Sequence, residues 1–106
     1  MEPECIFCEL ANDPARQLRW QNDVAVAFND RNPQAPVHVL VVPRVHVKNL
    51  DALDDEALAG RLLMAVREVI QLLGLVEANQ VVIHGEQIDH LHFHVMSDNR
   101  YTPPTA

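Results

Sequence analysis

The sequence predicts an α+β domain, with five short strands in a mainly antiparallel sheet and one long amphipathic helix. Residues 54–73 repeat apolar side chains at the three- and four-residue spacing of a helix with one buried stripe. The other apolar segments are short, and tight turns separate them except where the helix intervenes, which favours antiparallel pairing. The 106 residues are long enough for one core, so residues 1–106 are expected to form a single domain.

The N-terminal half is expected to hold an arm and three strands. Residues 1–14 are predicted to form the arm, with a short helix from Cys8 to Asn12 that ends before Pro14. Asn22-Asp23 is a two-residue hairpin signal, although the favoured glycine is missing. Residues 30–36 contain two prolines and are expected to form a loop. The strands predicted around these turns span residues 17–21, 24–29 and 38–43.

The long helix has recognisable end signals. Asp54 or Asp51 can cap its start, and Gly74 suits its C-terminal end. Its apolar stripe is expected to cover one face of the sheet. The stripe consists of Leu58, Leu62, Val66, Val69, Ile70 and Leu73.

Two further strands are predicted after the helix, over residues 81–84 and 91–96. Residues 85–89 between them are expected to form a turn. The tail, residues 98–106, contains consecutive prolines and is expected to be extended and weakly ordered.

Composition and charge limit the class of partner. The hydrophobic fraction of 48% and the charged fraction of 22% are those of an ordinary globular domain. A net charge of −7 argues against nonspecific binding to nucleic acid or to an anionic membrane, and no apolar run is long enough to span a bilayer. The acidic, polar N-terminus does not resemble a signal peptide, so a cytoplasmic location is expected. A small phosphate-bearing ligand remains compatible with this charge.

Three histidines alternate with apolar residues in the segment HLHFHVM, which starts at His90. Alternate residues of a strand share a face, so His90, His92 and His94 are expected on one side, facing a cleft or solvent. The simplest interpretation is a polar strand face, although β-branched residues make better strands. The residues expected on the other side, packed beneath the helix, are Leu91, Phe93 and Val95.

Two kinds of chemistry suit these imidazoles. Same-face positions lie about 6.5–7 Å apart, so the outer two backbones are about 13 Å apart, which is awkward for one tetrahedral ion. An ion can instead recruit one histidine together with Cys5, Cys8 and His46. Alternatively, a neutral imidazole can attack phosphorus, and His92, with a histidine on each side, is the geometric candidate for the nucleophile.

Cys5 and Cys8 form a C-x-x-C pair. In a cytosolic chain such a pair is more typical of a metal half-site or a redox pair than of a structural disulfide. A redox pair is expected to open a long helix in a βαβ unit, and here no strand is predicted before it. Two inert thiols are the third interpretation.

Four segments resemble the histidine triad (HIT) superfamily, particularly its nucleotide-binding branch and its zinc-containing bacterial members. HLHFHVM fits the His-φ-His-φ-His-φ-φ signature, in which φ is apolar, and residues 5–8, CIFC, are similar to the family's N-terminal motif. Residues 27–38 resemble its A-F-x-D-x-x-P-Q-A-P-x-H segment, and residues 39–46, VLVVPRVH, resemble x-L-V-I-P-K-x-H. The resemblance covers residues 5–96 in the same order. It implies a HIT-like α+β fold with one main helix.

The resemblance also implies roles for individual residues. In this family the middle triad histidine, here His92, attacks the α-phosphorus of a nucleotide. A covalent nucleotidyl-histidine would form, and water would release the nucleoside monophosphate. His94 would bind phosphate oxygens, and His38 would support the triad through hydrogen bonds. Asp30 would accept hydrogen bonds from ribose hydroxyls, or it is an ordinary loop-capping residue.

Some bacterial members and the related uridylyltransferases bind a structural zinc ion. The resemblance places its ligands at Cys5, Cys8, His46 and His90, a complete Cys₂His₂ set. His90 would then hold structure while the other two triad histidines stay available for chemistry. In the alternative interpretation, the cysteines are small buried residues and His90 hydrogen-bonds to a backbone carbonyl.

The sequence departs from the nucleotide-binding branch just before the triad. That branch has an asparagine and then a glycine-rich loop, G-x-x-x-G-Q-S-V, that contacts phosphate and the leaving group. Here residues 84–89, HGEQID, are shorter, lack the serine and add two acids that oppose phosphate binding. His84 takes the asparagine's place, either as a site residue or as a strand-end histidine facing water. Gln87 is the candidate for the loop glutamine, and Arg100 or Arg44 can offset the acids.

The leading hypothesis is therefore a nucleotide hydrolase or transferase that acts through His92 on a nucleoside phosphoramidate or a related purine nucleotide. The alternatives are a nucleotide-binding or regulatory module with little catalysis, and a zinc-stabilised interaction domain. The resemblance further implies a homodimer. Zinc is expected to be structural, and catalysis is expected to need no cofactor.

Overall fold

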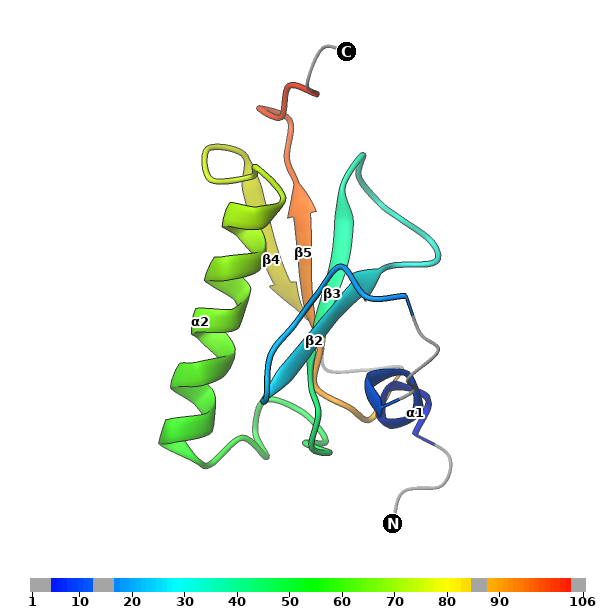
Figure 1. Ribbon diagram of the computed structural model, residues 1–106, viewed down its shortest axis with the longest axis vertical. Helices are drawn as coiled ribbons and strands as arrows, with labels where there is room; N and C mark the ends of the chain where they lie inside the picture. The colour runs from blue at the N-terminus through cyan, green and yellow to red at the C-terminus, as the bar shows by residue number, and fades with distance from the viewer. Residues whose placement is uncertain (1–4, 13–16, 85–87, 104–106) are drawn as a thin grey trace.

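In the described part of the chain, a five-stranded antiparallel sheet and two helices form the architecture (Figure 1). The structure is a computed structural model that describes residues 5–12, 17–84 and 88–103. The strand order is β1-β2-β3-β5-β4, and each neighbouring pair is antiparallel. The α+β prediction is confirmed. The elements are α1 (Ile6–Asn12), β1 (Trp20–Gln21), β2 (Ala25–Asn29), β3 (His38–Pro43), α2 (Glu56–Leu72), β4 (Asn79–Ile83) and β5 (Phe93–Ser97).

Apolar side chains are buried on both faces of the sheet. Figure 1 shows α2 along one face and α1 against the other. In β3, Val39 and Val41 join the core beneath α2, whereas Leu40 and Val42 join a second, smaller core beneath α1. All six residues of β3 are buried, which explains why its sequence is an unbroken apolar run rather than an alternating one.

The predicted helix over residues 54–73 is present as α2. Its N-cap is Asp55, whose carboxylate accepts a hydrogen bond from the backbone N–H of Leu58 at 3.1 Å, so the predicted caps Asp54 and Asp51 are wrong. Several acids in a row made the choice ambiguous, because each offers the same capping oxygen. Gly74 follows the helix with a φ of 71°, a left-handed conformation that glycine adopts without strain. No helix in the described ranges is long and apolar enough to cross a membrane.

The first hairpin forms where it was predicted, with a shorter first strand. The side chain of Asn22 accepts hydrogen bonds from the backbone N–H groups of Val24 and Ala25, which makes the turn without glycine. Strand β1 is only Trp20–Gln21 rather than residues 17–21. The N-terminal helix starts at Ile6 rather than Cys8.

The largest departure concerns the last strand, which was predicted over residues 91–96 but begins at Phe93. The backbone N–H of Leu91 donates to the carbonyl of Val47, at 2.7 Å, instead of to a strand. His90 and His92 therefore precede the strand, and the even spacing expected for three same-face histidines does not hold. The apolar residues expected beneath α2 are buried there, namely Leu91, Phe93 and Val95.

The remaining segments agree in part with their predictions. Strand β4 covers Asn79–Ile83 rather than residues 81–84. Residues 88–90 form a bend, while most of the expected turn at residues 85–89 lies outside the described residues. The tail begins with a turn in which the N–H of Tyr101 donates to the carbonyl of Asp98 at 3.0 Å.

Candidate active site and metal centre

A pocket of about 700 Å³ lies on the α1 side of the sheet and receives most of the predicted catalytic and substrate-binding residues. Phe7, Phe28 and Leu40 belong to the second core and also line the pocket. The pocket therefore has one apolar side and one side rich in imidazoles. Apolar lining comes mainly from Phe7, Leu10, Phe28 and Leu40. Polar lining comes from Asp30, Arg31, Gln34, His38, His84, His92 and His94, among others.

His92 is buried, with 5% of its surface exposed. Its Nδ1 lies 2.8 Å from the backbone carbonyl of His90. A carbonyl can only accept, so Nδ1 carries the proton and donates. In the neutral ring the other nitrogen, Nε2, then carries the lone pair. The backbone thereby selects the tautomer that can act as a nucleophile at Nε2.

His38 and His94 form a directed hydrogen-bonded chain. The backbone N–H of Gln34 donates to Nδ1 of His38 at 2.9 Å, so Nε2 of the neutral His38 ring carries the proton. That Nε2 lies 2.9 Å from Nδ1 of His94 and donates to it. Nδ1 of His94 is therefore an acceptor, which leaves the proton of the neutral His94 ring on Nε2. His94 thus has the opposite tautomer to His92 and offers an N–H to a ligand.

Burial and neighbouring imidazoles keep these rings neutral. Burial lowers the pKa of His38, although the Asp30 carboxylate opposes that shift. Burial, with the imidazoles of His92, His38 and His84, lowers the pKa of His94 to about 4. At neutral pH His94 is therefore a neutral hydrogen-bond donor and not a cation.

Asp30 directly follows β2, and its two carboxylate oxygens have different partners. One oxygen, Oδ1, accepts from the backbone N–H of Asn32 at 2.8 Å. The other, Oδ2, lies 3.3 Å from Nε2 of His38 and 3.8 Å from Nδ1 of His94. The loop-capping interpretation and the site interpretation are therefore compatible, since different oxygens serve them.

Asp30, His38 and His94 are also close enough together to be considered as metal ligands. The hydrogen bond from Gln34 argues against this, because it holds the proton of His38 on Nε2, the atom that an ion would need. The group is better described as a hydrogen-bonded network.

His84 lies at the end of β4 and lines the pocket. Its ring contacts that of His94, with the centroids 4.8 Å apart and the planes at 77°. Its side chain is exposed at the pocket. Of its two interpretations, the ring contact and the pocket position favour the one that makes it a site residue.

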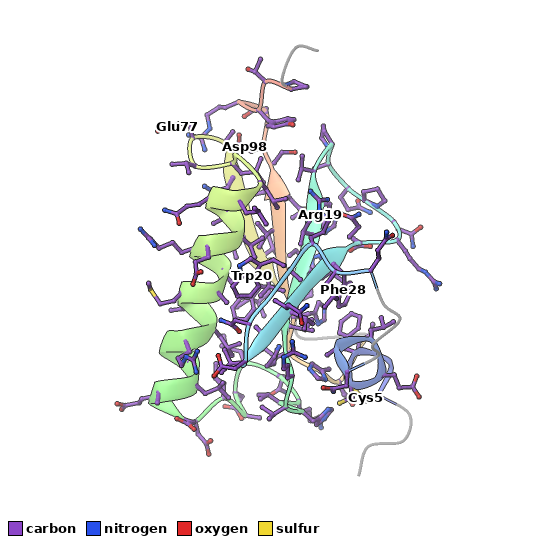
Figure 2. All side chains as sticks on the ribbon, in the orientation of Figure 1. Cys5, Arg19, Trp20, Phe28, Glu77 and Asp98 are labelled. Carbon is purple, nitrogen blue, oxygen red and sulfur yellow. The ribbon has the colours of Figure 1, made fainter. Side chains whose placement is uncertain are left out.

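Of the other two predicted substrate-binding residues, the structure describes only Arg100, which does not line the pocket. Gln87 lies outside the described residues. Arg100 is exposed and forms an ion pair with Asp98, which Figure 2 shows at the opposite end of the molecule from Cys5. Arg44 also lies elsewhere, where it donates to the carbonyl of Asn22 and to the side chain of Gln21. The pocket cation that sequence reasoning missed is Arg31.

The predicted metal ligands converge beneath α1, and we call Cys5, Cys8, His46 and His90 the metal cluster. Nδ1 of His90 lies 3.2 Å from the sulfur of Cys5 and 3.3 Å from that of Cys8. Nδ1 of His46 lies 3.3 Å from the sulfur of Cys8. A tetrahedral zinc ion, with Zn–S of about 2.3 Å and Zn–N of about 2.0 Å, separates such atoms by roughly 3.5 Å. The donor atoms are therefore close to the spacing that one ion requires.

The tautomer of His90 also suits a metal. His90 is fully buried, which corrects the expectation that it faces a cleft or solvent. Its Nε2 donates to the carbonyl of Pro43 at 2.9 Å, so its lone pair is on Nδ1, the atom that faces both sulfurs. The carbonyl bond expected in the alternative to zinc is thus present, and it orients His90 for metal binding rather than replacing it.

Phe7 contacts both the metal cluster and the pocket, and it was not predicted as a site residue. Its ring packs edge-on against His92 at 5.0 Å and against His90 at 6.1 Å, between centroids. Phe7 lies between the two cysteines, and Leu10 follows it by three residues, so both face the sheet from one side of α1. This helical spacing was the available signal.

Comparison with known proteins identifies the relatives of this chain. The HIT domain family model matches residues 14–101. The protein HitA of Neisseria gonorrhoeae is 33% identical over 87% of this chain and 94% of its own length. A histidine triad protein from Clostridium difficile aligns with a TM-score of 0.81 at 28% identity, over 96% of each chain. A HIT family hydrolase from Legionella pneumophila aligns with a TM-score of 0.82 at 27% identity, over 94% of this chain and 97% of its own. This chain belongs to the HIT domain family.

Proposed function

We propose that this chain is a nucleotide hydrolase or transferase that acts at the α-phosphorus of a purine nucleotide, with a nucleoside phosphoramidate or a related compound as substrate. The observation that carries this proposal is the hydrogen bond from Nδ1 of His92 to the carbonyl of His90. It holds the lone pair on Nε2 of a ring that lines the pocket, which is the state required of a nucleophile.

The reaction then has two displacements. Nε2 of His92 attacks phosphorus, the bond to the leaving group breaks, and a nucleotidyl-histidine forms. Water attacks the same phosphorus, the P–N bond breaks, and the nucleoside monophosphate leaves. Nε2–H of His94 donates to a phosphoryl oxygen, and His38 holds His94 in the donating tautomer. A fixed neutral donor stabilises the charge that develops on that oxygen.

The pocket also contains groups that suit the rest of a nucleotide. Asp30 has the acceptor capacity for ribose hydroxyls. The apolar side of the pocket, formed by Phe7, Leu10, Phe28 and Leu40, suits a flat base. A volume of about 700 Å³ falls within the usual range for small-molecule sites.

We further propose that the metal cluster holds a structural zinc ion. Cys5, Cys8, His46 and His90 would be its ligands. When bound, zinc supplies a cross-link from α1 to the segments after β3 and before β5, and it takes no part in the reaction.

The test is the release of AMP from an adenosine phosphoramidate. The wild-type chain is expected to release AMP, and His92→Asn to lower kcat by at least about 10⁴-fold, since loss of a nucleophile removes the covalent route. AMP affinity, measured by calorimetry, should change less than about threefold and serves as the folding control. Activity that survives the substitution would refute the role of His92. Binding of AMP without release by the wild type would instead favour a nucleotide-binding module.

We also propose a homodimer. Strand β4 is at one edge of the described sheet, and its Val81 is 40% exposed. On α2, Leu63, Met64 and Leu72 are each more than half exposed, so an apolar surface adjoins an open strand edge. Sedimentation should find a species of twice the chain mass, and Val81→Glu should shift it to the monomer.

A further inference from the structure

We propose that His84 is a further catalytic residue, the proton donor to the leaving group and then the proton acceptor from water. This inference rests on the proposed function above. His84 is absent from the two displacements as described, which leave the proton of the leaving group unassigned.

The position of His84 comes from the register of β4 and β5. Val82 is paired with His94, and alternate residues share a face of a strand. His84, two residues after Val82, therefore lies on the same face as His94. Its ring contacts that of His94, and its side chain is exposed at the pocket.

The ring contacts place His94 between the nucleophile and His84. The centroids of His92 and His94 are 5.1 Å apart, and those of His94 and His84 are 4.8 Å apart. No ring contact joins His84 to His92, both of which the structure describes. In an in-line displacement the leaving group departs opposite the nucleophile. A phosphoryl group held by His94 and attacked by His92 thus directs its leaving group toward His84.

The other titratable groups that line the described pocket are less suited to proton transfer. His38 and His94 are held neutral by burial. The N–H of His38 donates to His94, and the N–H of His94 is the proposed donor to a phosphoryl oxygen. His92 forms the covalent bond, while a guanidinium such as that of Arg31 does not give up its proton. Asp30 is a carboxylate that faces His38 and His94. An exposed imidazole exchanges protons with water and is the usual group for transfer near neutral pH.

The proton balance closes over the two displacements. In the first, the P–N bond to His92 forms, the bond to the leaving amine breaks, and the imidazolium of His84 gives its proton to that amine. In the second, water attacks phosphorus and gives one proton to the neutral His84 imidazole. Its hydroxyl stays on phosphorus, and His92 leaves with its lone pair on Nε2. The imidazolium of His84 is regenerated.

Two substrates separate proton donation from simple binding. An adenosine alkyl-phosphoramidate has a leaving amine that needs a proton, whereas adenosine 5′-(p-nitrophenyl) phosphate has a phenolate that leaves without one. His84→Gln is expected to lower kcat/KM for the amidate by about 100-fold or more and for the nitrophenyl ester by less than about threefold. The same variant should show a burst of nitrophenolate near one per chain, followed by slow turnover, because water attack has lost its base. His84→Asn, a second non-titrating amide, should behave alike.

Val76→Thr is the matched control, because Val76 is exposed between α2 and β4 and does not line the pocket. It should leave both substrates unchanged. An equal loss on both substrates in His84→Gln would overturn the proposal, since a phosphate-binding role predicts that result. No loss on either would overturn it as well. A wild type that cleaves neither substrate would refute the proposed function, and this role of His84 with it.

Discussion

The metal cluster and the pocket contain the same kind of side chain only two residues apart in the sequence, at His90 and His92. Both rings donate to a backbone carbonyl, but through different nitrogens. His90 uses Nε2, toward Pro43, and so turns its Nδ1 lone pair to the two sulfurs. His92 uses Nδ1, toward His90 itself, and keeps its lone pair on Nε2. One arrangement suits a metal ion, and the other suits attack on phosphorus.

His94 differs from both because a donor rather than an acceptor faces its Nδ1. The chain from the N–H of Gln34 through His38 makes His94 an acceptor at Nδ1 and a donor at Nε2. Identical side chains therefore acquire three chemical characters from their hydrogen-bond partners. The predictions below test whether the metal cluster and the pocket act independently, as these hydrogen-bond partners suggest.

Removal of metal should have the largest effect on stability. Free zinc at a thousand times its Kd stabilises the folded state by about 4 kcal/mol, so chelation should lower the free energy of unfolding by a comparable amount. Cys8→Ser, which removes a ligand, should abolish the effect of chelator. Denaturant unfolding with and without chelator, together with metal analysis, checks both. Purified protein with less than about one ion per two chains, and stability indifferent to chelator, would eliminate the zinc proposal.

Acid should lower the stability of the fold through protonation of His94. The pKa of His94 is lowered from 6.5 to about 4, so the unfolded chain binds a proton over that interval and the folded chain does not. Stability is therefore complete above about pH 6.5 and falls as the pH drops toward 4, by roughly 3 kcal/mol from this residue. His94→Asn should show a flatter profile between these limits. If the stability of His94→Asn falls with acid as steeply as that of the wild type, groups other than His94 cause the pH dependence.

The fold was largely predictable because its main signals are local. The apolar spacing of α2, the run in β3 and the turn at Asn22 each depend on residues within a few positions. The start of β5 was not predictable, because the N–H of Leu91 bonds to Val47, which is distant in sequence. Alternation of histidine with apolar residues was typical of a strand, but tertiary contacts made the strand begin two residues later than predicted.

The ligand set and the triad were named from motifs, yet their tautomers required three dimensions. The partners that assign them are backbone groups of Pro43, His90 and Gln34, and a backbone group carries no mark in the sequence. Arg100 was predicted to offset the acids of residues 84–89, but the turn after β5 pairs it with Asp98 instead.

Changes at His38 should separate tautomer control from packing. His38→Gln retains an amide N–H that can donate to Nδ1 of His94, whereas His38→Leu fills the space without a donor. We expect kcat to fall about 10- to 100-fold in His38→Leu, as the loss of one hydrogen bond to a buried network costs about 1–3 kcal/mol. His38→Gln should recover most of it. Equal activity in the two variants, measured as AMP release, would show that His38 only fills space.

The smallest effect should come from Phe7, whose ring contacts His90 of the metal cluster and His92 of the pocket. Phe7→Leu preserves an apolar contact but removes the edge-on packing against His90 and His92, which is worth about 0.5–1.5 kcal/mol for an aromatic pair. If the metal cluster and the pocket are coupled through this ring, chelation should weaken AMP binding about fivefold in the wild type and clearly less in Phe7→Leu. Before chelation, both proteins should contain the same amount of metal. A thermodynamic cycle over metal and substitution measures that coupling directly. An identical response in both proteins would mean that the Phe7 ring does not couple the two groups. The metal cluster would then stabilise only the fold, and β3 and β5 would position the pocket residues without it.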